Sequence, residues 1–463
     1  MKLEIPTQVA KILDKFEKAN YEIYIVGGAV RDILMGKSVY DWDFTTNATP
    51  DKMLKIFPDA FYDNVFGTIG ISSDIEGERP YEITTFRTEH GYSDARRPDK
   101  VEWGKTLEED LKRRDFTINA LALDITDHRS PTTDHTLITV EAKIIDLFNG
   151  QSDIKKRLIR AVGDPNERFS EDALRMMRAI RIAAELGFTI EEKTFEAINV
   201  NATLINKISK ERVKDELLKI LASPNPYDGM LLFKNSLLMQ EILPEMEKTF
   251  GVEQKSPGRH HIYDVGTHSM LSLKYVAEKN KNPIVRLATL IHDIAKPITF
   301  KKLETGTITF YNHEILGAII AKRIADRLRF SNKEKDKFYR LVRWHQFSVD
   351  EHQTDSALRR FIRRVGLENL ADILDLRTGD RLGGGARETS WRLEEFKKRL
   401  IEVQKQPFTV HDLKIKGNDV MEIMGIPPGP KVGEILQKLF DEVVEKKMDN
   451  ERSDLLKRLN ELK

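Results

Sequence analysis

Two aspartates near the N-terminus, Asp41 and Asp43, have the spacing of a metal-binding pair. They alternate with Trp42 and Phe44, so on an extended strand both carboxylates face one side and both rings the other. Mg²⁺ prefers carboxylates, waters and substrate phosphates, and two such ions can hold the attacking and leaving oxygens of a phosphoryl or nucleotidyl transfer. Asp-x-Asp is also common in polar strand ends and loops, so the pair alone is weak evidence.

A phosphate-binding turn is predicted directly before these aspartates. Residues 24–26 suit a buried strand, Gly27 and Gly28 permit a tight turn, and residues 29–35 favour a helix. The first N–H groups of that helix would point at an anion above the turn, and Arg31 would add a positive charge. Gly-Gly is common in ordinary turns. The order strand, Gly-Gly, helix with arginine, and Asp-x-Asp is much more specific.

A second pair of basic residues, Arg113 and Arg114, precedes an apolar segment. Guanidinium groups pair bidentately with phosphate, so this pair could meet a triphosphate. Basic residues that offset the dipole at a helix C-terminus would look the same, and the two interpretations are evenly matched.

A third stretch carries polar residues at every third position of a predicted helix. Ser170 suits its N-cap, and the side chains that follow form one ridge of roughly 13 Å, at about 1.5 Å per residue. An aspartate accepts from the amino group of a base and an arginine donates to ring acceptors, so the first two residues of the ridge could read a base edge. The ridge consists of Asp172, Arg175, Arg178 and Arg181.

Histidines and aspartates in the C-terminal half form a fourth group of candidate ligands. Imidazole nitrogens and carboxylate oxygens together can hold a divalent metal that activates water. A degenerate module kept for packing or RNA contact is the competing interpretation. The residues are His268, His292, Asp293, His313, His345 and Asp380.

Length and composition limit the domain number, the nucleic-acid contacts and the cysteine chemistry that this chain can have. A chain of 463 residues exceeds the size at which a protein forms a single hydrophobic core, so more than one domain is expected. With 40% hydrophobic residues, 32% charged residues and a net charge of +1, the chain has no overall basic field. Any nucleic-acid contact must come from local basic clusters, each of which is more commonly a solvated helix face. The chain has no cysteine, which excludes disulfides, thiolate metal sites and a cysteine nucleophile. Without a signal-peptide block or a membrane-spanning apolar run, we expect a cytoplasmic protein with no membrane contact.

The hydrophobic pattern predicts an α+β fold, in which a small N-terminal domain with a mixed sheet precedes an essentially all-α remainder. We expect a mobile surface loop over 89–105 and a loop excursion over 126–136. Helices are predicted over 7–19, 49–57 and 107–114, and strands over 66–71, 81–86, 118–124 and 144–146.

These motifs together resemble the class II tRNA nucleotidyltransferases, the CCA-adding enzymes of the polymerase beta superfamily. The resemblance lies in Gly27-Gly28-x-x-Arg31-Asp32 with Asp41-x-Asp43, in Arg113-Arg114-Asp115-Phe116-Thr117-Ile118-Asn119-Ala120, and in Glu171-Asp172-x-x-Arg175. It implies template-independent addition of the 3′-terminal CCA to tRNA from CTP and ATP, with release of pyrophosphate. It also implies a nucleotidyltransferase head over 1–150, a helical neck over 151–225, a helical body over 226–355 and a tRNA-binding tail over 356–463.

The same resemblance implies roles for single residues. Asp41 and Asp43 would bind Mg²⁺ as catalytic residues, and Asp172 with Arg175 would select cytosine and then adenine. Glu82 is a further candidate carboxylate, although a solvated strand acid would look the same. The nucleotide would be held by Gly28, Arg31, Arg114, Arg178 and Arg181, and the tail would contact tRNA through Arg359, Arg360, Arg363 and Arg364.

Sister activities within this family add only A, only CC, or poly(A). Residues 82–87 lead into 92–98 in a way that resembles the flexible loop of full CCA-adding enzymes, which favours CCA addition and leaves A-only addition open.

The group of histidines and aspartates resembles the HD superfamily of metal-dependent phosphohydrolases. That resemblance implies a second divalent metal and a hydrolytic activity on RNA ends, as an addition or an alternative to nucleotide transfer. Its core ligands would be His268, His292, Asp293 and Asp380, with His313 and His345 as ligands of a further metal.

Overall fold

The computed structural model describes residues 1–64, 67–72, 80–90, 100–131, 136–255, 262–350, 353–404, 410–445 and 447–463. The chain divides into two compact units, residues 1–247 with 327–329, and residues 248–326 with 330–463. Among the described residues no helix combines the length and the apolar character that crossing a membrane requires.

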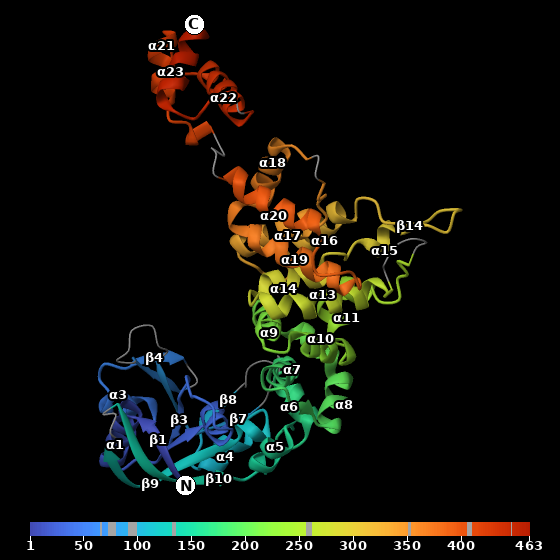
Figure 1. Cartoon of the computed structure of the whole chain (residues 1–463). Helices are drawn as coiled ribbons and strands as arrows, with labels where there is room; N and C mark the ends of the chain where they lie inside the picture. The colour runs from blue at the N-terminus through green and yellow to red at the C-terminus, as the bar shows by residue number, and fades with distance from the viewer. Residues whose placement is uncertain are drawn as a thin grey trace. The chain divides into compact units, whose positions relative to one another are not determined.

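A mixed sheet forms the N-terminal part of the first unit (Figure 1). Within the described residues it has eight strands in the order β1-β10-β9-β2-β3-β6-β5-β4, and β3 runs parallel to β6 while the other neighbours are antiparallel. The strands are β1 (Lys2–Pro6), β2 (Ile23–Val26), β3 (Asp43–Thr46), β4 (Phe61–Asn64), β5 (Thr68–Ile71), β6 (Tyr81–Thr85), β9 (Leu121–Pro131) and β10 (Leu137–Asp146).

Amphipathic helices cover this sheet and bury its core. Phe16 of α1 and Met53 of α3 are fully buried with Ile25, Phe44 and Ile83 of the central strands. Burying such side chains is worth about 1.5–3 kcal/mol each, so this layer fixes the strands that carry the candidate metal ligands. The helices of this part are α1 (Thr7–Lys18), α2 (Gly28–Leu34), α3 (Pro50–Ile56), α4 (Leu107–Lys112) and the 3₁₀ turn η1 (Thr117–Asn119).

Two loop predictions in this region are wrong for the residues that the structure describes. Residues 126–131 of the predicted excursion over 126–136 are instead strand, since β9 extends to Pro131, and its partner β10 begins at Leu137. The segment 89–105 contains strand residues at both ends, where β7 (Arg87–His90) pairs with β8 (Lys100–Trp103). Both stretches are polar and lack the apolar alternation by which strands are recognised in sequence. Residues 91–99 and 132–135 lie outside the described part of the chain.

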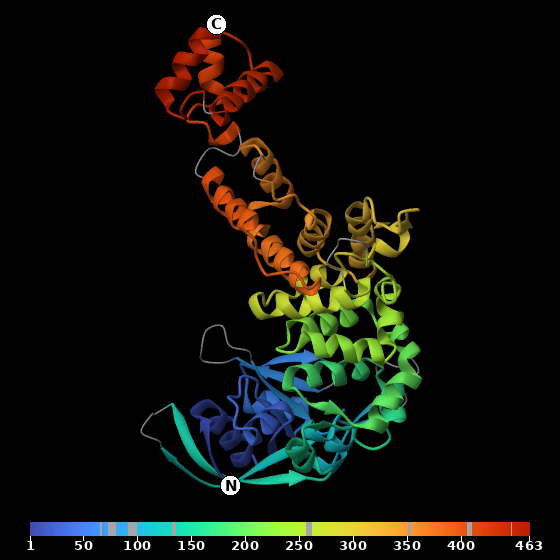
Figure 2. The ribbon, with the colours of Figure 1, turned by 45° about the vertical axis from the view of Figure 1, so that its right-hand side comes forward.

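Helices make up most of the remainder of the first unit (Figure 2). The predicted single helix across residues 170–181 is wrong, because α6 ends at Glu171 and α7 begins at Leu174. Ser170 therefore lies inside α6, whose N-cap is Asp164. These elements are α5 (Gly150–Lys156), α6 (Pro165–Glu171), α7 (Leu174–Leu186), α8 (Glu192–Asn201), η2 (Ala202–Lys207), α9 (Lys210–Ala222), α10 (Pro226–Asn235), α11 (Leu238–Ile242) and α12 (Pro244–Glu247), with the short strands β11 (Leu158–Ile159) and β12 (Thr189–Ile190).

The described residues of the second unit are helical apart from a two-stranded ribbon of β13 (Lys301–Lys302) and β14 (Ile308–Thr309). The last three helices bury a separate apolar cluster that includes Val420, Leu439 and Leu455. The predicted α+β fold class is confirmed. The helices are α13 (Val265–Lys279), α14 (Pro283–Ile291), α15 (Lys296–Thr299), α16 (His313–Arg327), α17 (Asn332–Trp344), α18 (Asp355–Val365), η3 (Leu367–Asn369), α19 (Leu370–Gly383), α20 (Trp391–Gln404), η4 (Val410–Asp412), α21 (Gly417–Met424), α22 (Pro430–Val444) and α23 (Arg452–Glu461).

Candidate functional site

The turn between β2 and α2 brings backbone close to charged side chains. Gly27 has φ +73°, which L side chains rarely adopt, and it caps α2. A Cβ added to Gly27 would lie 3.1 Å from Arg114 Nη1 and 3.5 Å from Asp43 Oδ2. Glycine at this position therefore lets the turn approach both the predicted metal ligand and a predicted phosphate ligand.

Of the two predicted metal ligands, only Asp43 belongs to β3. Asp43 is the first residue of the strand and pairs with Val26 of β2 and Glu82 of β6, while Asp41 precedes the strand and is exposed. Burial, and then the negative charge of Asp41, raise the pKa of the Asp43 carboxyl. Two hard oxygen donors whose mutual repulsion is incompletely neutralised by the protein fit a divalent cation.

A cavity of about 710 Å³ connects these carboxylates with helices α7 and α9. It has enough room for a nucleotide, since ligand pockets typically measure about 300–1,000 Å³. Every residue predicted for the head and neck lines it, so the structure brings together residues that are up to 153 positions apart in sequence, from Gly28 to Arg181. These residues are Gly28, Arg31, Asp41, Asp43, Glu82, Arg114, Asp172, Arg175, Arg178 and Arg181.

The arginines of α7 are held by acidic partners that sequence reasoning missed. Arg178 donates to Asp115 Oδ2 through Nε at 2.8 Å and Nη2 at 2.6 Å. Arg181 donates through Nε to Glu216 Oε2 at 2.8 Å. Each of these acids is buried, so the ion pairs fix where the guanidinium groups lie.

The Asp115 carboxylate is the most strongly bound of these partners. Burial alone would raise its pKa, but the Arg178 guanidinium outweighs burial and lowers the pKa to about 2. Asp115 Oδ1 also accepts from its neighbour Phe116 N–H at 2.9 Å and from Asn119 Nδ2 at 3.4 Å. The motif that contains Arg113 and Arg114 is thereby attached to α7.

Asp172 occupies the break between α6 and α7 and has an extended backbone, with φ −138° and ψ 103°. Its Oδ1 accepts from Leu174 N–H at 3.0 Å, and its Oδ2 accepts from Arg212 Nη2 at 2.9 Å. Arg175 donates through Nη1 to Glu171 Oε2 at 2.6 Å and through Nη2 to the Arg113 carbonyl at 3.1 Å. The ridge thus begins with an aspartate in a break and continues along a helix with the three arginines.

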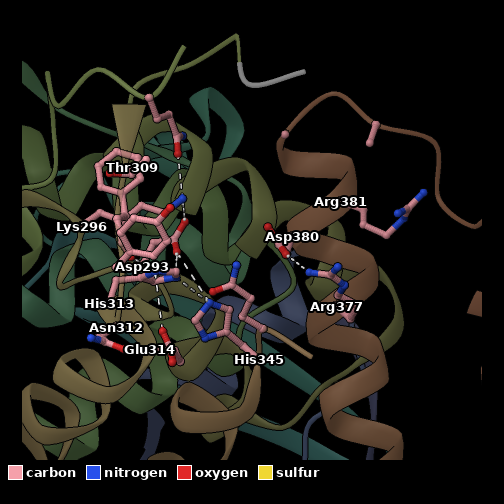
Figure 3. A pocket seen from close by; sticks show the side chains of 16 residues that line it. Asp293, Lys296, Thr309, Asn312, His313, Glu314, His345, Arg377, Asp380 and Arg381 are labelled. Atoms are coloured by element: carbon pink, nitrogen blue, oxygen red, sulfur yellow. Dashed lines mark hydrogen bonds and ion pairs between the residues drawn. The ribbon is translucent and has the colours of Figure 1, made fainter. Parts of the chain in front are cut away.

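The second unit holds a separate cluster of histidines and aspartates beside a cavity of about 690 Å³ (Figure 3). His268 Nε2 lies 3.2 Å from His292 Nε2 and 3.2 Å from Asp380 Oδ1, and His292 Nε2 lies 3.1 Å from Asp293 Oδ2. Asp380 comes from α19, whereas Asp293 directly follows His292 at the end of α14 (Figure 3). The four residues predicted as core ligands therefore meet at one point.

Backbone contacts orient three of the imidazoles toward this cluster. Nδ1 of His292, His313 and His345 lies 2.7, 2.7 and 2.8 Å, respectively, from the carbonyl of the residue three positions earlier. A carbonyl can only accept, so each Nδ1 donates, and in the neutral ring Nε2 presents its lone pair to the cluster. Histidine ligands of metals are commonly oriented in this way.

Charge is concentrated around these ligands. Burial lowers the pKa of His292, but Asp293 and Asp380 outweigh burial and raise it to about 10. Lys296 Nζ lies 2.7 Å from Asp293 Oδ2, and Arg377 Nη1 lies 3.1 Å from Asp380 Oδ2. The donor set fits a divalent metal, which would replace the proton that His292 otherwise holds.

The basic residues predicted to contact RNA divide into two groups. Arg360, Arg363 and Arg364 lie exposed on α18, and the Arg364 guanidinium lies 5.0 Å from the centroid of the Trp344 ring. The prediction for Arg359 is wrong, because its side chain is buried at 2% exposure and burial lowers its pKa.

Comparison with known proteins agrees with the site geometry. Residues 23–160 match the family model "Poly A polymerase head domain". Residues 187–250 match "Probable RNA and SrmB- binding site of polymerase A", and residues 317–459 match "tRNA nucleotidyltransferase domain 2".

Relatives along the whole chain decide the family. The CCA-adding enzyme of Ligilactobacillus salivarius is 33% identical over 99% of this chain and 98% of the enzyme. The chain belongs to the CCA-adding enzyme family. The enzyme of Lactococcus lactis subsp. cremoris strain SK11 is 31% identical over 98% of this chain and 97% of that enzyme. The match to the Lactobacillus helveticus enzyme is 44% identical and spans 50% of this chain and 54% of the relative.

Solved structures of CCA-adding enzymes have the same fold. The Bacillus stearothermophilus CCA-adding enzyme in complex with CTP has a TM-score of 0.66 and 28% identity, and the match covers 98% of this chain and 96% of that one. The Thermotoga maritima CCA-adding enzyme complexed with tRNA has a TM-score of 0.55 at 19% identity, over 99% and 97% of the two chains, which supports the fold alone.

The Asp115–Arg178 pair predicts a specific dependence of stability on pH. The pKa of about 2 lies below the ordinary value, so the pair stabilises the fold above about pH 4, and this stabilisation is lost as the pH falls toward 2. We expect Asp115→Asn to cost on the order of 2 kcal/mol at pH 7 and progressively less below pH 4. Thermal unfolding of both proteins from pH 7 to pH 3 measures this difference. An equal difference at every pH would contradict the assignment.

Proposed function

We propose that this protein adds the 3′-terminal CCA to tRNA from CTP and ATP, without a nucleic-acid template and with release of pyrophosphate. The observation that carries the proposal is the single cavity in which Asp41 and Asp43 meet the ridge of Asp172 and Arg175. Relatives that match along the whole chain are CCA-adding enzymes, and family relatives have been solved in complexes with CTP, ATP and tRNA.

In the proposed reaction the tRNA 3′-hydroxyl attacks the α-phosphorus of the nucleotide. A new O–P bond forms, the bond to the β-phosphate oxygen breaks, and pyrophosphate leaves while the hydroxyl proton is lost to solvent. Nucleotidyltransferases of this family depend on divalent metal. We propose Mg²⁺, held by Asp41 and Asp43, which when bound would activate the hydroxyl and neutralise phosphate charge.

The triphosphate would lie against the basic side of the cavity. Arg31 and Arg114 enter it from the head, and Arg178 and Arg181 enter it from α7. Their acidic partners hold the guanidinium groups in place before the nucleotide arrives, which reduces the entropy lost on binding. Gly28 leaves its backbone accessible beside them.

Base selection follows from the chemistry of Asp172 and Arg175. Cytosine and adenine both present an exocyclic amino donor beside a ring-nitrogen acceptor, which match a carboxylate acceptor and a guanidinium donor. Uracil and guanine present a carbonyl oxygen and a ring N–H at the same places. Their carbonyl oxygen would face the Asp172 carboxylate, acceptor against acceptor, and their ring N–H would face the Arg175 guanidinium, donor against donor. One pair of side chains can therefore admit C and A and exclude U and G.

We further propose that exposed Arg360, Arg363 and Arg364 contact tRNA phosphates, which would position the RNA without reading its sequence. The division of the chain into a head over 1–150, a neck over 151–225, a body over 226–355 and a tail over 356–463 remains our prediction. The cytoplasm, where a reducing environment suits a chain without cysteine, remains the predicted location.

The metal ligands give the sharpest test of this function. We expect Asp41→Asn and Asp43→Asn each to lower the rate of CMP incorporation into tRNA by more than about 100-fold. Substitution of a residue that merely hydrogen-bonds to a metal ligand already lowers metal affinity or activity by about 10–100-fold. Asp51→Asn, an exposed acid in the first turn of α3, is the matched control and should keep full activity. Normal incorporation by Asp43→Asn would rule out the proposed centre.

We propose a second activity for the cluster of the second unit, hydrolysis of a phosphoester by an HD-type metal site. The observation in its favour is that imidazole Nε2 atoms of four histidines converge on Asp293 and Asp380. His268, His292, Asp293 and Asp380 would hold the metal, which supplies an activated water when bound. Lys296, Arg377 and Arg381 line the same cavity and would bind phosphate.

Metal content separates the two proposed centres. We expect Asp293→Asn to lose one equivalent of bound Mn²⁺ or Zn²⁺ after dialysis, together with hydrolysis of bis(p-nitrophenyl) phosphate, while CMP incorporation continues. Asp336→Asn, an exposed acid paired with Arg340 on α17, is the control. Elemental analysis of wild-type protein, Asp293→Asn and Asp43→Asn makes the comparison. Unchanged metal content in Asp293→Asn would exclude a metal at this cluster.

A further inference from the structure

Arg212 on α9 contacts the predicted base-reading carboxylate directly. Its Nη2 lies 2.9 Å from Asp172 Oδ2, and both side chains line the nucleotide cavity. The Arg212 side chain is 32% exposed and that of Asp172 is 18% exposed, so the pair is at the cavity wall and accessible to a ligand. In the part of the chain that the structure describes, Arg212 forms its ion pair with Asp172 and with no other acid.

The position of Asp172 makes such a partner necessary. The residue lies in the break between α6 and α7, where its N–H donates to the Arg168 carbonyl at 3.4 Å and its carbonyl accepts from Arg175 N–H at 3.0 Å. These contacts hold the backbone and leave the carboxylate to be oriented by its own partners. Leu174 N–H donates to Asp172 Oδ1. Rotation of the carboxylate about that contact is therefore limited by the group that binds Oδ2. A group that reads a base edge must be fixed within about 0.5 Å.

The other arginines near Asp172 are already committed elsewhere. Arg175 donates to Glu171, Arg178 to Asp115 and Arg181 to Glu216 and Glu185. Asp172 does influence Arg178 through its charge, yet the guanidinium of Arg178 is hydrogen-bonded to Asp115. Orientation of Asp172 Oδ2 therefore depends on Arg212.

The contact leaves the carboxylate able to accept from a base. Each carboxylate oxygen has two acceptor positions, and Leu174 N–H and Arg212 use one on each oxygen. A free acceptor position on each oxygen remains for the amino group of cytosine or adenine. Arg212 thus constrains the direction of the acceptor without consuming it.

We propose that Arg212 is a positioning residue for nucleotide selection, which holds the Asp172 carboxylate in the orientation that accepts from C and A and excludes U and G. This inference rests on the proposed function of the cavity. If the carboxylate rotated freely, it would no longer be held against the carbonyl oxygen of uracil or guanine, and these bases would be disfavoured less. Loss of Arg212 would therefore affect the choice among nucleotides more than the rate of transfer itself.

The test measures incorporation of CTP and UTP separately on tRNA that ends just before CCA. We expect Arg212→Ala to lower the ratio of kcat/KM for CTP over UTP by about tenfold or more, the equivalent of about 1.4 kcal/mol. Arg212→Gln keeps an N–H donor on a shorter side chain and should recover part of the ratio. Lys210→Ala removes a cation from the same helix outside the cavity lining and should keep the wild-type ratio.

A double-mutant cycle distinguishes positioning from a general structural role. If Arg212 acts through Asp172, Arg212→Ala should leave the CTP over UTP ratio of Asp172→Ala unchanged. A wild-type ratio in Arg212→Ala, or equal losses that add in the double variant, would overturn the proposal. The Arg212→Gln variant maintains the test if the alanine variant fails to fold. Wild-type protein that incorporates no CMP would instead contradict the proposed function.

Discussion

The ion pair between the buried Asp115 and Arg178, which faces the cavity, connects the two halves of the nucleotide cavity. Asp115 follows the arginine pair that faces the phosphates, and Arg178 lies in the middle of the helix that carries the base-reading ridge. Removing one member of such a pair leaves a buried charge without its partner, which is strongly unfavourable. The distance between the metal ligands and the base-reading residues is therefore set by this contact, together with the Arg175 hydrogen bond to the Arg113 carbonyl.

Ion pairs within the protein make the cavity ready for an anionic ligand. Arginines that line it are paired to Asp110, Asp115, Glu171, Glu185 and Glu216, so their positions are fixed while several N–H donors remain to face the cavity. At the β3 side of the cavity, burial and then repulsion from Asp41 raise the pKa of Asp43. A divalent cation would offset the negative charge of these two carboxylates, so we place the metal at this wall of the cavity.

Local sequence predicted the chemical groups of this site well and their partners poorly. Gly27, Asp41 and Asp43 are recognisable because a tight turn and alternating carboxylates have short-range signatures. Asp115, Glu216 and Arg212 were missed because their importance comes from contacts 35 to 63 residues away, which no local pattern encodes. One available signal was the spacing of Asp110 and Arg114, four apart on a predicted helix.

The errors in the fold have similar causes. The break at Asp172 and Ala173 interrupts a stretch with good helical periodicity, and it is stabilised by the long-range contact with Arg212. Arg359 looked like part of a basic surface because four arginines lie within six residues of α18, but an amphipathic helix turns one of them toward the core. The polar outer part of the β9 and β10 hairpin lacks the alternation that marks strands.

We propose that one cavity reads bases with protein side chains and adds C, C and A in order. The most direct test is to sequence the products formed with Mg²⁺ and all four nucleotides on tRNAs that end before, within and after the CC step. We expect each of these tRNAs to be completed to CCA and not extended further. Products that end at CC, addition of A to the tRNA that already ends in CC with no extension of the other two, or runs of A would contradict it.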